Sequence, residues 1–95
     1  MTGAERAEVI AAAKRLDELS AELDKRGFQA RVLVAADKVR VWVQNRSISR
    51  LSDAVYAAPD SDGEWWIWWS WDDRIAAIDD IDTAAFNIAY VLTPA

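Results

Sequence analysis

Five of the six tryptophans in this chain fall within seven consecutive residues, Trp65 to Trp71. An apolar run of this length, rich in aromatic residues and bounded by turn-forming residues, is typical of a β-strand buried on both faces. Side chains alternate along a strand, so we expect two sets pointing in opposite directions: Trp65, Ile67, Trp69 and Trp71 on one side, and Trp66, Trp68 and Ser70 on the other. A domain built on this strand must cover two aromatic faces.

A chain of 95 residues is expected to form one domain, residues 1–95, because it is too short for a second core. It contains no Cys and no His, which excludes disulfides, thiolate nucleophiles, and thiolate or imidazole metal ligands. Its aspartates stand where turns and helix starts use them, and it has no Gly-rich phosphate loop. We therefore predict a protein that is not an enzyme and has no catalytic residue, cofactor or metal.

The net charge of −5 is divided unevenly along the chain. Residues 1–50 carry ten Lys/Arg and seven Asp/Glu, a net +3, whereas residues 51–95 carry Arg74 against nine acids, a net −8. Such polarity suits pairing with a partner or with a second copy, unless folding mixes the two halves in space. The N-terminus lacks a signal-peptide pattern and no apolar run has membrane-spanning length, so we expect a cytoplasmic protein with no membrane association.

Residues 4–26 predict an amphipathic helix, because apolar side chains recur every three or four residues at Val9, Ala12, Leu16, Leu19 and Leu23. Thr2 is the expected N-cap. Gly27 is expected to end the helix in a left-handed conformation.

Residues 28–35 and 38–45 alternate as two β-strands do. A tight turn at Ala36-Asp37, or a loop one residue longer on each side, aligns three apolar pairs: Val34 with Val39, Val32 with Val41, and Ala30 with Val43. Both apolar rows then lie on one face, which supports this register. The opposite face carries Arg31, Lys38, Arg40 and Trp42, where Arg31 is expected to lie over the Trp42 ring.

Residues 53–58 are a further strand candidate, and the turn Asp60-Ser61-Asp62-Gly63 returns the chain into the tryptophan strand. This turn has the opening of a calcium loop but lacks the later ligands that such a loop needs. After Trp71, Asp72-Asp73-Arg74 is expected to form a turn, with Arg74 paired to neighbouring acids. Asp79 or Asp80 then caps a last helix, from about Ile81 to Leu92.

The element order predicts an α+β fold: a helix, a three- to four-stranded antiparallel sheet and a second helix, with both helices on one face. The larger aromatic set is expected to face the helices, which leaves an association surface on the other face. We predict that surface to comprise Trp42, Trp66, Trp68, Arg31 and Arg40. The partner would be a second copy, as a homodimer, or another protein.

Two other readings of this surface stay open. A pocket lined by tryptophans is suited to a small ligand. The aromatic and basic side chains are also suited to single-stranded nucleic acid. The helix–sheet–helix order resembles that of double-stranded-RNA-binding domains, but Asp79, Asp80 and Asp82 stand where that family has phosphate-binding basic residues. We therefore do not expect nucleic acid to be a partner.

The segment from Glu64 to Leu92 combines a Trp-Trp-x-Trp-Trp-Ser-Trp core, Asp73-Arg74-Ile75 and Asp79-Asp80 ahead of an Ala-rich helix. It resembles small, acidic, tryptophan-rich actinobacterial proteins. The resemblance covers the last third of the chain. It implies a bacterial cytoplasmic protein and brings no activity, cofactor or site.

Overall fold

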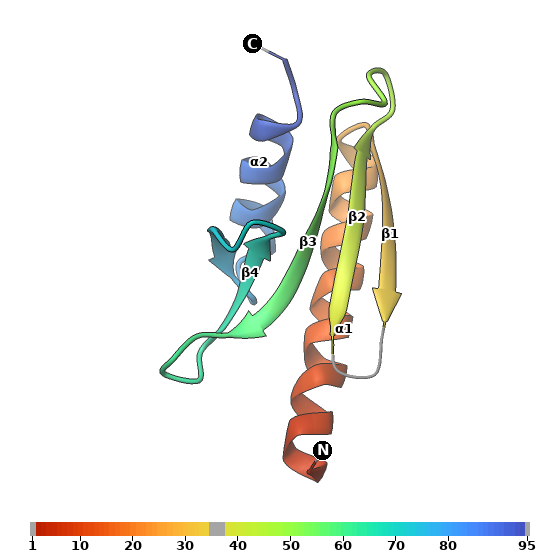
Figure 1. Ribbon diagram of the computed structural model, residues 1–95. Coiled ribbons are helices and arrows are strands. Elements are labelled where there is room, and N and C mark those ends of the chain that lie inside the picture. The colour runs from red at the N-terminus through yellow and green to blue at the C-terminus, as the bar shows by residue number, and fades with distance from the viewer. Residues whose placement is uncertain (1, 35–37, 95) are drawn as a thin grey trace.

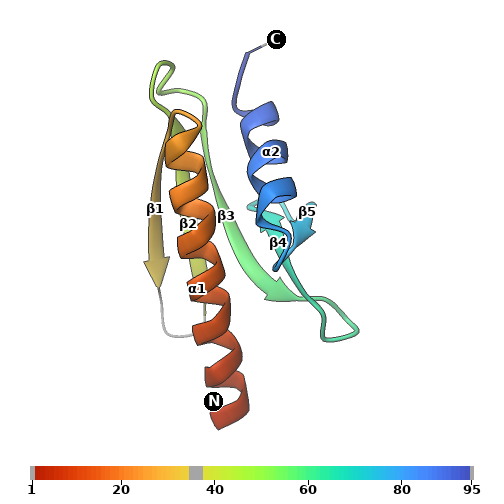
Figure 2. The same ribbon diagram turned by 180° about the vertical axis from the view of Figure 1, so that it is seen from behind.

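A computed structural model of the protein describes residues 2–34 and 38–94. Five strands form one antiparallel sheet in the order β1-β2-β3-β4-β5, and both helices lie on one side of it (Figures 1 and 2). The elements along the chain are α1 (Gly3–Lys25), β1 (Phe28–Val34), β2 (Val39–Asn45), β3 (Ser52–Pro59), β4 (Trp65–Trp69), β5 (Arg74–Ala77) and α2 (Ile81–Val91). The predicted α+β class is confirmed, but the sheet has five strands, not three or four.

The strand missing from the prediction is β5, where we had expected only a turn around Arg74. Its four residues are too few to show an alternating pattern, and its pairing with β4 is irregular between Ile67 and Trp68. The strand is held by tertiary contacts: it pairs with β4, and Ile75 and Ala76 are buried in the core. Local periodicity cannot reveal a strand of this kind.

Helix α1 begins and ends as predicted. The Thr2 hydroxyl accepts a hydrogen bond from the Glu5 backbone N–H at 3.2 Å, and Gly27 has φ +91° just after the helix. Ala12, Leu16, Leu19 and Leu23 are buried against the sheet. A glycine is suited to this end because a side chain would make the positive φ unfavourable.

The first hairpin has the predicted register. Val34, Val32 and Ala30 of β1 pair with Val39, Val41 and Val43 of β2. The three β2 valines are buried, so the apolar rows face the helices. The turn predicted at Ala36-Asp37 lies outside the described residues.

The tryptophan strand faces the predicted way, but it is shorter than expected. Ile67 and Trp69 are buried in the core and Trp65 packs against it. Trp71, expected in this set, follows the end of β4 and is 50% exposed, with its ring stacked on Trp69 at a centroid distance of 4.8 Å. The backbone N–H of Trp69 donates to the backbone carbonyl of Asp73 at 2.8 Å. This bond closes a turn and takes Trp71 out of the sheet.

Helix α2 begins after Asp80, whose side chain accepts from the Thr83 N–H at 3.3 Å. Its inner face buries Ala84, Ala85 and Ile88. At its other end, the Asn45 side chain donates to the carbonyl of Leu92 at 2.9 Å. This bond ties the end of β2 to the C-cap residue of the helix.

Each outer strand of the sheet is capped by a helix side chain. Ser20 of α1 donates to the carbonyl of Ala30 in β1 at 3.2 Å. Asn87 of α2 donates to the carbonyl of Ile75 in β5 at 3.0 Å. Each bond satisfies a backbone acceptor on a strand that has a neighbour on one side only.

Candidate functional site

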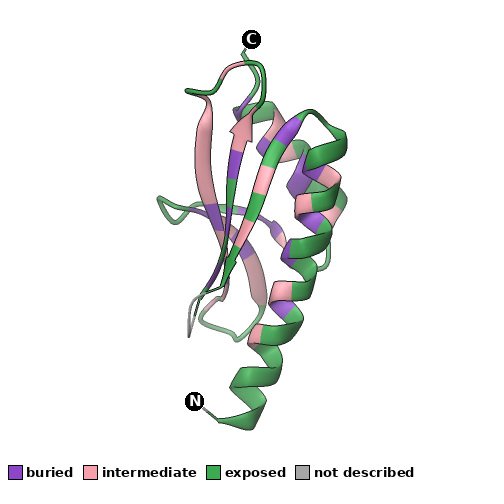
Figure 3. Ribbon diagram, turned by 90° about the vertical axis from the view of Figure 1, so that its right-hand side faces the viewer, coloured by how far each residue is buried: buried purple, intermediate pink, exposed green. Residues whose placement is uncertain are grey.

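The side of the sheet away from the helices, here called the open face, carries no helix in the described part of the chain (Figure 3). One residue from each strand forms a row across this face, each paired to the next: Leu33, Arg40, Tyr56, Trp68 and Arg74. Trp42 and Arg31 are cross-strand partners beside this row, and Trp66 lies on the same side of β4 as Trp68. The structure therefore brings the five predicted surface residues together on one face.

Trp66 and Trp68 are held in place by their own hydrogen bonds. The Trp66 ring N–H donates to Asp60 Oδ2 at 2.9 Å, and the Trp68 ring N–H donates to the carbonyl of Ala58 at 3.0 Å. The Arg74 guanidinium lies 4.5 Å from the Trp66 ring centroid and 5.2 Å from that of Trp68. Both rings are half-buried, so Trp42, at 42% exposed, is the open member of the three.

Two predicted contacts of the arginines are wrong. Arg31 and Trp42 are neighbours in register, but the cation–π contacts among residues 2–34 and 38–94 are those of Arg74. Arg74 pairs at 3.4 Å with Asp60, fourteen residues earlier, and not with the acids next to it in sequence. The missed strand explains this second error, because β5 brings Arg74 across β4 onto the open face.

Asp60 organises the turn between β3 and β4. Its Oδ1 accepts from the N–H groups of Asp62 and Glu64, at 2.9 and 3.0 Å. Its side chain is only 8% exposed. Partial burial opposes its ionisation, but hydrogen bonds from Glu64, Trp66 and Asp62, with the charge of Arg74, outweigh this and hold the pKa of the carboxyl below its usual range. Asp60 therefore acts as an ionised anchor for the tryptophan side of the open face.

The sequence of the Asp60 turn matches the opening of a calcium loop. In the structure, the Asp60 carboxylate accepts hydrogen bonds that hold the turn and the Trp66 ring. Both oxygens of Asp60 already accept hydrogen bonds from the protein. In the part of the chain that the structure describes, no three acidic side chains group as metal ligands.

Tyr56 is tied to the turn that follows β4. Its hydroxyl donates to Asp72 Oδ1 at 2.5 Å, and Asp72 has φ +71°, a left-handed conformation that Asp tolerates better than most residues. The hydrogen bond to Asp72, followed by partial burial and the negative charge of Asp72, raises the pKa of Tyr56 to about 12. At neutral pH the phenol is thus a fixed donor.

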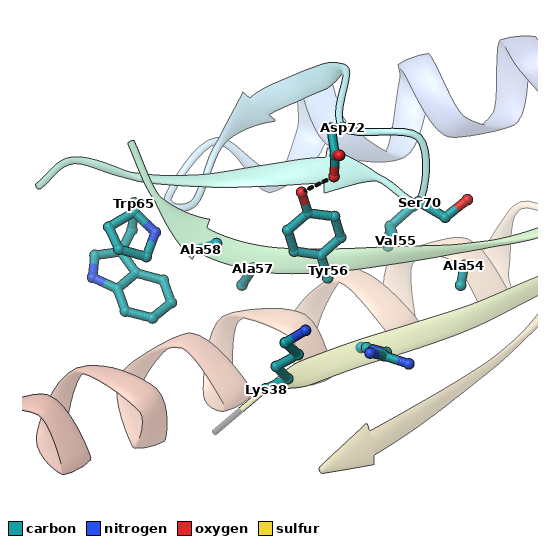
Figure 4. A pocket seen from close by; sticks show the side chains of 11 residues that line it. Lys38, Ala54, Val55, Tyr56, Ala57, Ala58, Trp65, Ser70 and Asp72 are labelled. Atoms are coloured by element: carbon teal, nitrogen blue, oxygen red, sulfur yellow. Dashed lines mark hydrogen bonds between the residues drawn. The ribbon is translucent and has the colours of Figure 1, made fainter. Parts of the chain in front are cut away.

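A hollow of about 450 Å³ surrounds Tyr56 on the open face (Figure 4). Ala54 and Ala58 lie on either side of Tyr56 along β3, and their small side chains leave room beside the ring. Lys38, just before β2, and Arg40, in β2, line the hollow on one side, and Ser70 and Asp72 line it from the turn after β4. Tyr56, Ser70 and Asp72 were absent from the predicted site.

The polar groups of this hollow differ in whether their hydrogen-bond donors are already used within the protein. The Ser70 hydroxyl donates to Asp53 at 2.7 Å, and the Tyr56 hydroxyl donates to Asp72, so both are already engaged. Lys38 and Arg40 are exposed, and neither is within 4.0 Å of a carboxylate in the described residues. The hollow therefore offers cationic donors, which suit a carboxylate.

Aromatic side chains are more exposed on α2 than on the open face. Phe86 is 60% exposed and Tyr90 76% exposed, one turn apart. Together with Arg26, Thr93 and Pro94 they line a shallow hollow of about 440 Å³. Phe86 and Tyr90 were not among the surface residues predicted from the sequence.

No family model, curated protein or solved structure matches this chain. The resemblance to acidic actinobacterial proteins thus stays a prediction. Among the described residues, no helix is both long enough and apolar enough to span a bilayer.

Proposed function

We propose that this chain is a non-enzymatic protein-interaction module that associates with a second copy of itself through the open face, forming a homodimer. The observation that carries the proposal is the exposure of Trp42, Arg31 and Arg40 on a sheet face without helix cover. Tryptophan and arginine are the residues that most often supply binding energy at protein interfaces. A cytoplasmic location is part of the proposal.

The charge distribution favours a protein partner over a nucleic acid. Arg74 is already paired with Asp60, which leaves Arg31, Lys38 and Arg40 as the cations of the open face. Asp79, Asp80 and Asp82 surround the start of α2 and would repel phosphates. Binding to nucleic acid depends on neutralising several phosphates at once, which this arrangement does not favour.

A small-ligand site is the second candidate, because the hollow around Tyr56 has a volume within the range of known ligand pockets, roughly 300–1,000 Å³. A pocket lined by tryptophans had been expected, and the aromatic residues that line this hollow are Tyr56 and Trp65. An isolated ligand pocket would leave the protein monomeric, so the two candidates differ in oligomeric state.

Sedimentation equilibrium of the purified protein, from low to high micromolar concentration, tests the proposal. We expect a dimer for the parent and a folded monomer for Trp42→Ser. Phe86→Ser is the matched control, because Phe86 is more exposed than Trp42 but lies on α2. A parent that is monomeric at high micromolar concentration, or a dimer lost in the control and kept in Trp42→Ser, would refute the proposal.

Trp66 and Trp68 are less suitable for this test. Both rings are half-buried and hydrogen-bonded, so replacing them also weakens the fold. Loss of a dimer in those variants would not separate an interface from a structural role.

A further inference from the structure

We infer that the hollow around Tyr56 receives the acidic turn, residues 60–64 between β3 and β4, of a second copy. The inference rests on the proposed self-association and names the contact that carries it. Lys38 and Arg40 of one copy would bind the carboxylates of Asp62 and Glu64 of the other. By two-fold symmetry the same contact forms twice.

The hollow has the chemistry for carboxylates. Its two hydroxyls donate within the chain, to Asp53 and Asp72, so Lys38 and Arg40 are its available donors. Figure 4 shows Lys38 on the opposite side of Tyr56 from Asp72. Because the Tyr56 hydroxyl already donates its hydrogen bond to Asp72, an incoming carboxylate is directed toward the Lys38 and Arg40 side.

The acidic turn has free charges and a fixed shape. Asp62 and Glu64 are exposed, and in the described part of the chain neither is within 4.0 Å of a basic group. Asp60 N–H donates to the Glu64 carbonyl at 2.8 Å, and Gly63 N–H donates to the Asp60 carbonyl at 3.1 Å. A turn held by these bonds loses little conformational entropy on binding.

The placement of turn and hollow permits a reciprocal contact. The turn extends past the end of the sheet, beyond β3 and β4 (Figure 1), while the hollow lies on the open face near the same end, lined by Lys38 and Pro59. A two-fold axis that crosses the strands between them lays each turn over the other copy's hollow. Arg40 then meets carboxylates and avoids its own counterpart in the second copy.

Several other carboxylates are already engaged within the chain. Glu18 and Glu22 of α1 pair with Arg15 and Lys25 of the same helix and with its C-cap residue Arg26. Asp80 caps α2. The division of charge along the sequence, +3 in residues 1–50 and −8 in residues 51–95, matches a contact between Lys38 and Arg40 and a turn from the second half.

Two charge-reversed variants test the contact. In the first, K38E/R40E, the hollow becomes acidic; in the second, D62K/E64K, the turn becomes basic. Each variant alone should be monomeric, with a Kd raised about a hundredfold, from two reciprocal contacts that each contribute about tenfold. A 1:1 mixture should dimerise, because every hollow then meets a turn of opposite charge.

Circular dichroism and urea midpoints serve as folding controls, since all four positions are exposed. The milder D62N/E64Q variant provides a second test if either reversed variant is unstable, and it too should weaken the dimer. The parent dimer should also weaken between about 0.1 M and 1 M salt, as the screening length falls from about 10 Å to 3 Å.

The results separate this inference from the proposed function. If the parent dimerises and Trp42→Ser dissociates it, but the turn variants leave the dimer intact or the mixture stays monomeric, the turn is not the occupant and the open face remains the interface. A monomeric parent refutes both.

Discussion

Aromatic side chains lie outside the main core in two regions of this protein, and the two regions treat them differently. On the open face, Trp66 and Trp68 donate their ring N–H groups to Asp60 and Ala58 and lie beneath Arg74. On α2, Phe86 and Tyr90 are mostly exposed. The strand offers cross-strand neighbours that cover a ring, whereas the outer side of a surface helix offers only its own next turn.

This difference changes what the tryptophan-rich segment means for association. A count of tryptophans suggests a large apolar surface, but the polar partners of Trp66 and Trp68 keep much of those rings covered. The open face therefore contributes one exposed tryptophan, Trp42, and cations that pair with no carboxylate among residues 2–34 and 38–94. Its specificity is expected to come from charge more than from apolar area.

The largest expected effect is a difference in stability between substitutions in the two regions. Trp68→Ala should lower the free energy of unfolding by about 2–3 kcal/mol, somewhat less than for a fully buried tryptophan, because the ring is half-buried. Tyr90→Ala on α2 should cost about 0.5 kcal/mol or less. Urea midpoints at constant m-value measure both, and similar losses at the two sites would remove the distinction.

A smaller loss of stability is expected at the N-terminus of α2. The exposed aromatic side chains of this helix contribute little to its stability, so its N-cap matters more. Asp80→Ala removes the N-cap and should cost about 1 kcal/mol. Asp79→Ala is the matched control and should cost much less, because Asp80 makes the hydrogen bond to Thr83. A larger loss for Asp79 in urea denaturation would place the helix start elsewhere.

Acid should weaken the open face through Asp60. Its pKa is lowered in the folded protein, so its ionised form stabilises the fold above the unfolded pKa, near 3.8, and this contribution is lost as the pH falls through the folded value. Asp60→Asn should therefore be less stable than the parent at pH 6. The gap between their urea midpoints should narrow as the pH falls below the unfolded pKa, and a gap independent of pH would contradict this role.

The least disruptive test is a titration of Tyr56. With the pKa raised to about 12, the hydrogen bond to Asp72 is fully present below the unfolded value of 10.0 and is lost as the pH rises toward 12. Absorbance near 295 nm should show one tyrosine ionising late in the parent and earlier in Asp72→Asn. Tyr56→Phe identifies the signal, and an unchanged titration in Asp72→Asn would show that the bond does not hold in solution.

The fold was predictable from the sequence where apolar and polar residues alternate over enough positions to show which face of the strand each side chain occupies. The valines of β2 and the apolar residues of β1 determine both the hairpin register and the face turned to the helices. The same rule places Ile67 and Trp69 in the core. It failed at Trp71 because the turn closed by Asp73 ends the strand two residues early.

The candidate site was predictable only in part, for a related reason. Arg31, Arg40, Trp42, Trp66 and Trp68 follow from parity within single strands. Tyr56 depends on the register between β2 and β3, which is set by the hydrogen bond from Asn45 N–H to the Leu51 carbonyl across a loop without periodicity. The partners of Arg74 and Asp72 depend on β5 and its turn, which tertiary contacts create.

The helix side chains that cap the outer strands bear on how far any self-association can proceed. Antiparallel sheets tend to polymerise by adding a strand at an open edge, which leads to fibres. Ser20 and Asn87 each occupy a carbonyl that an added strand would need. Contact through the face is then favoured over growth at the edges, and a two-fold contact is complete once two chains have met. A concentrated solution of this protein should consequently stay clear and contain particles of one finite size.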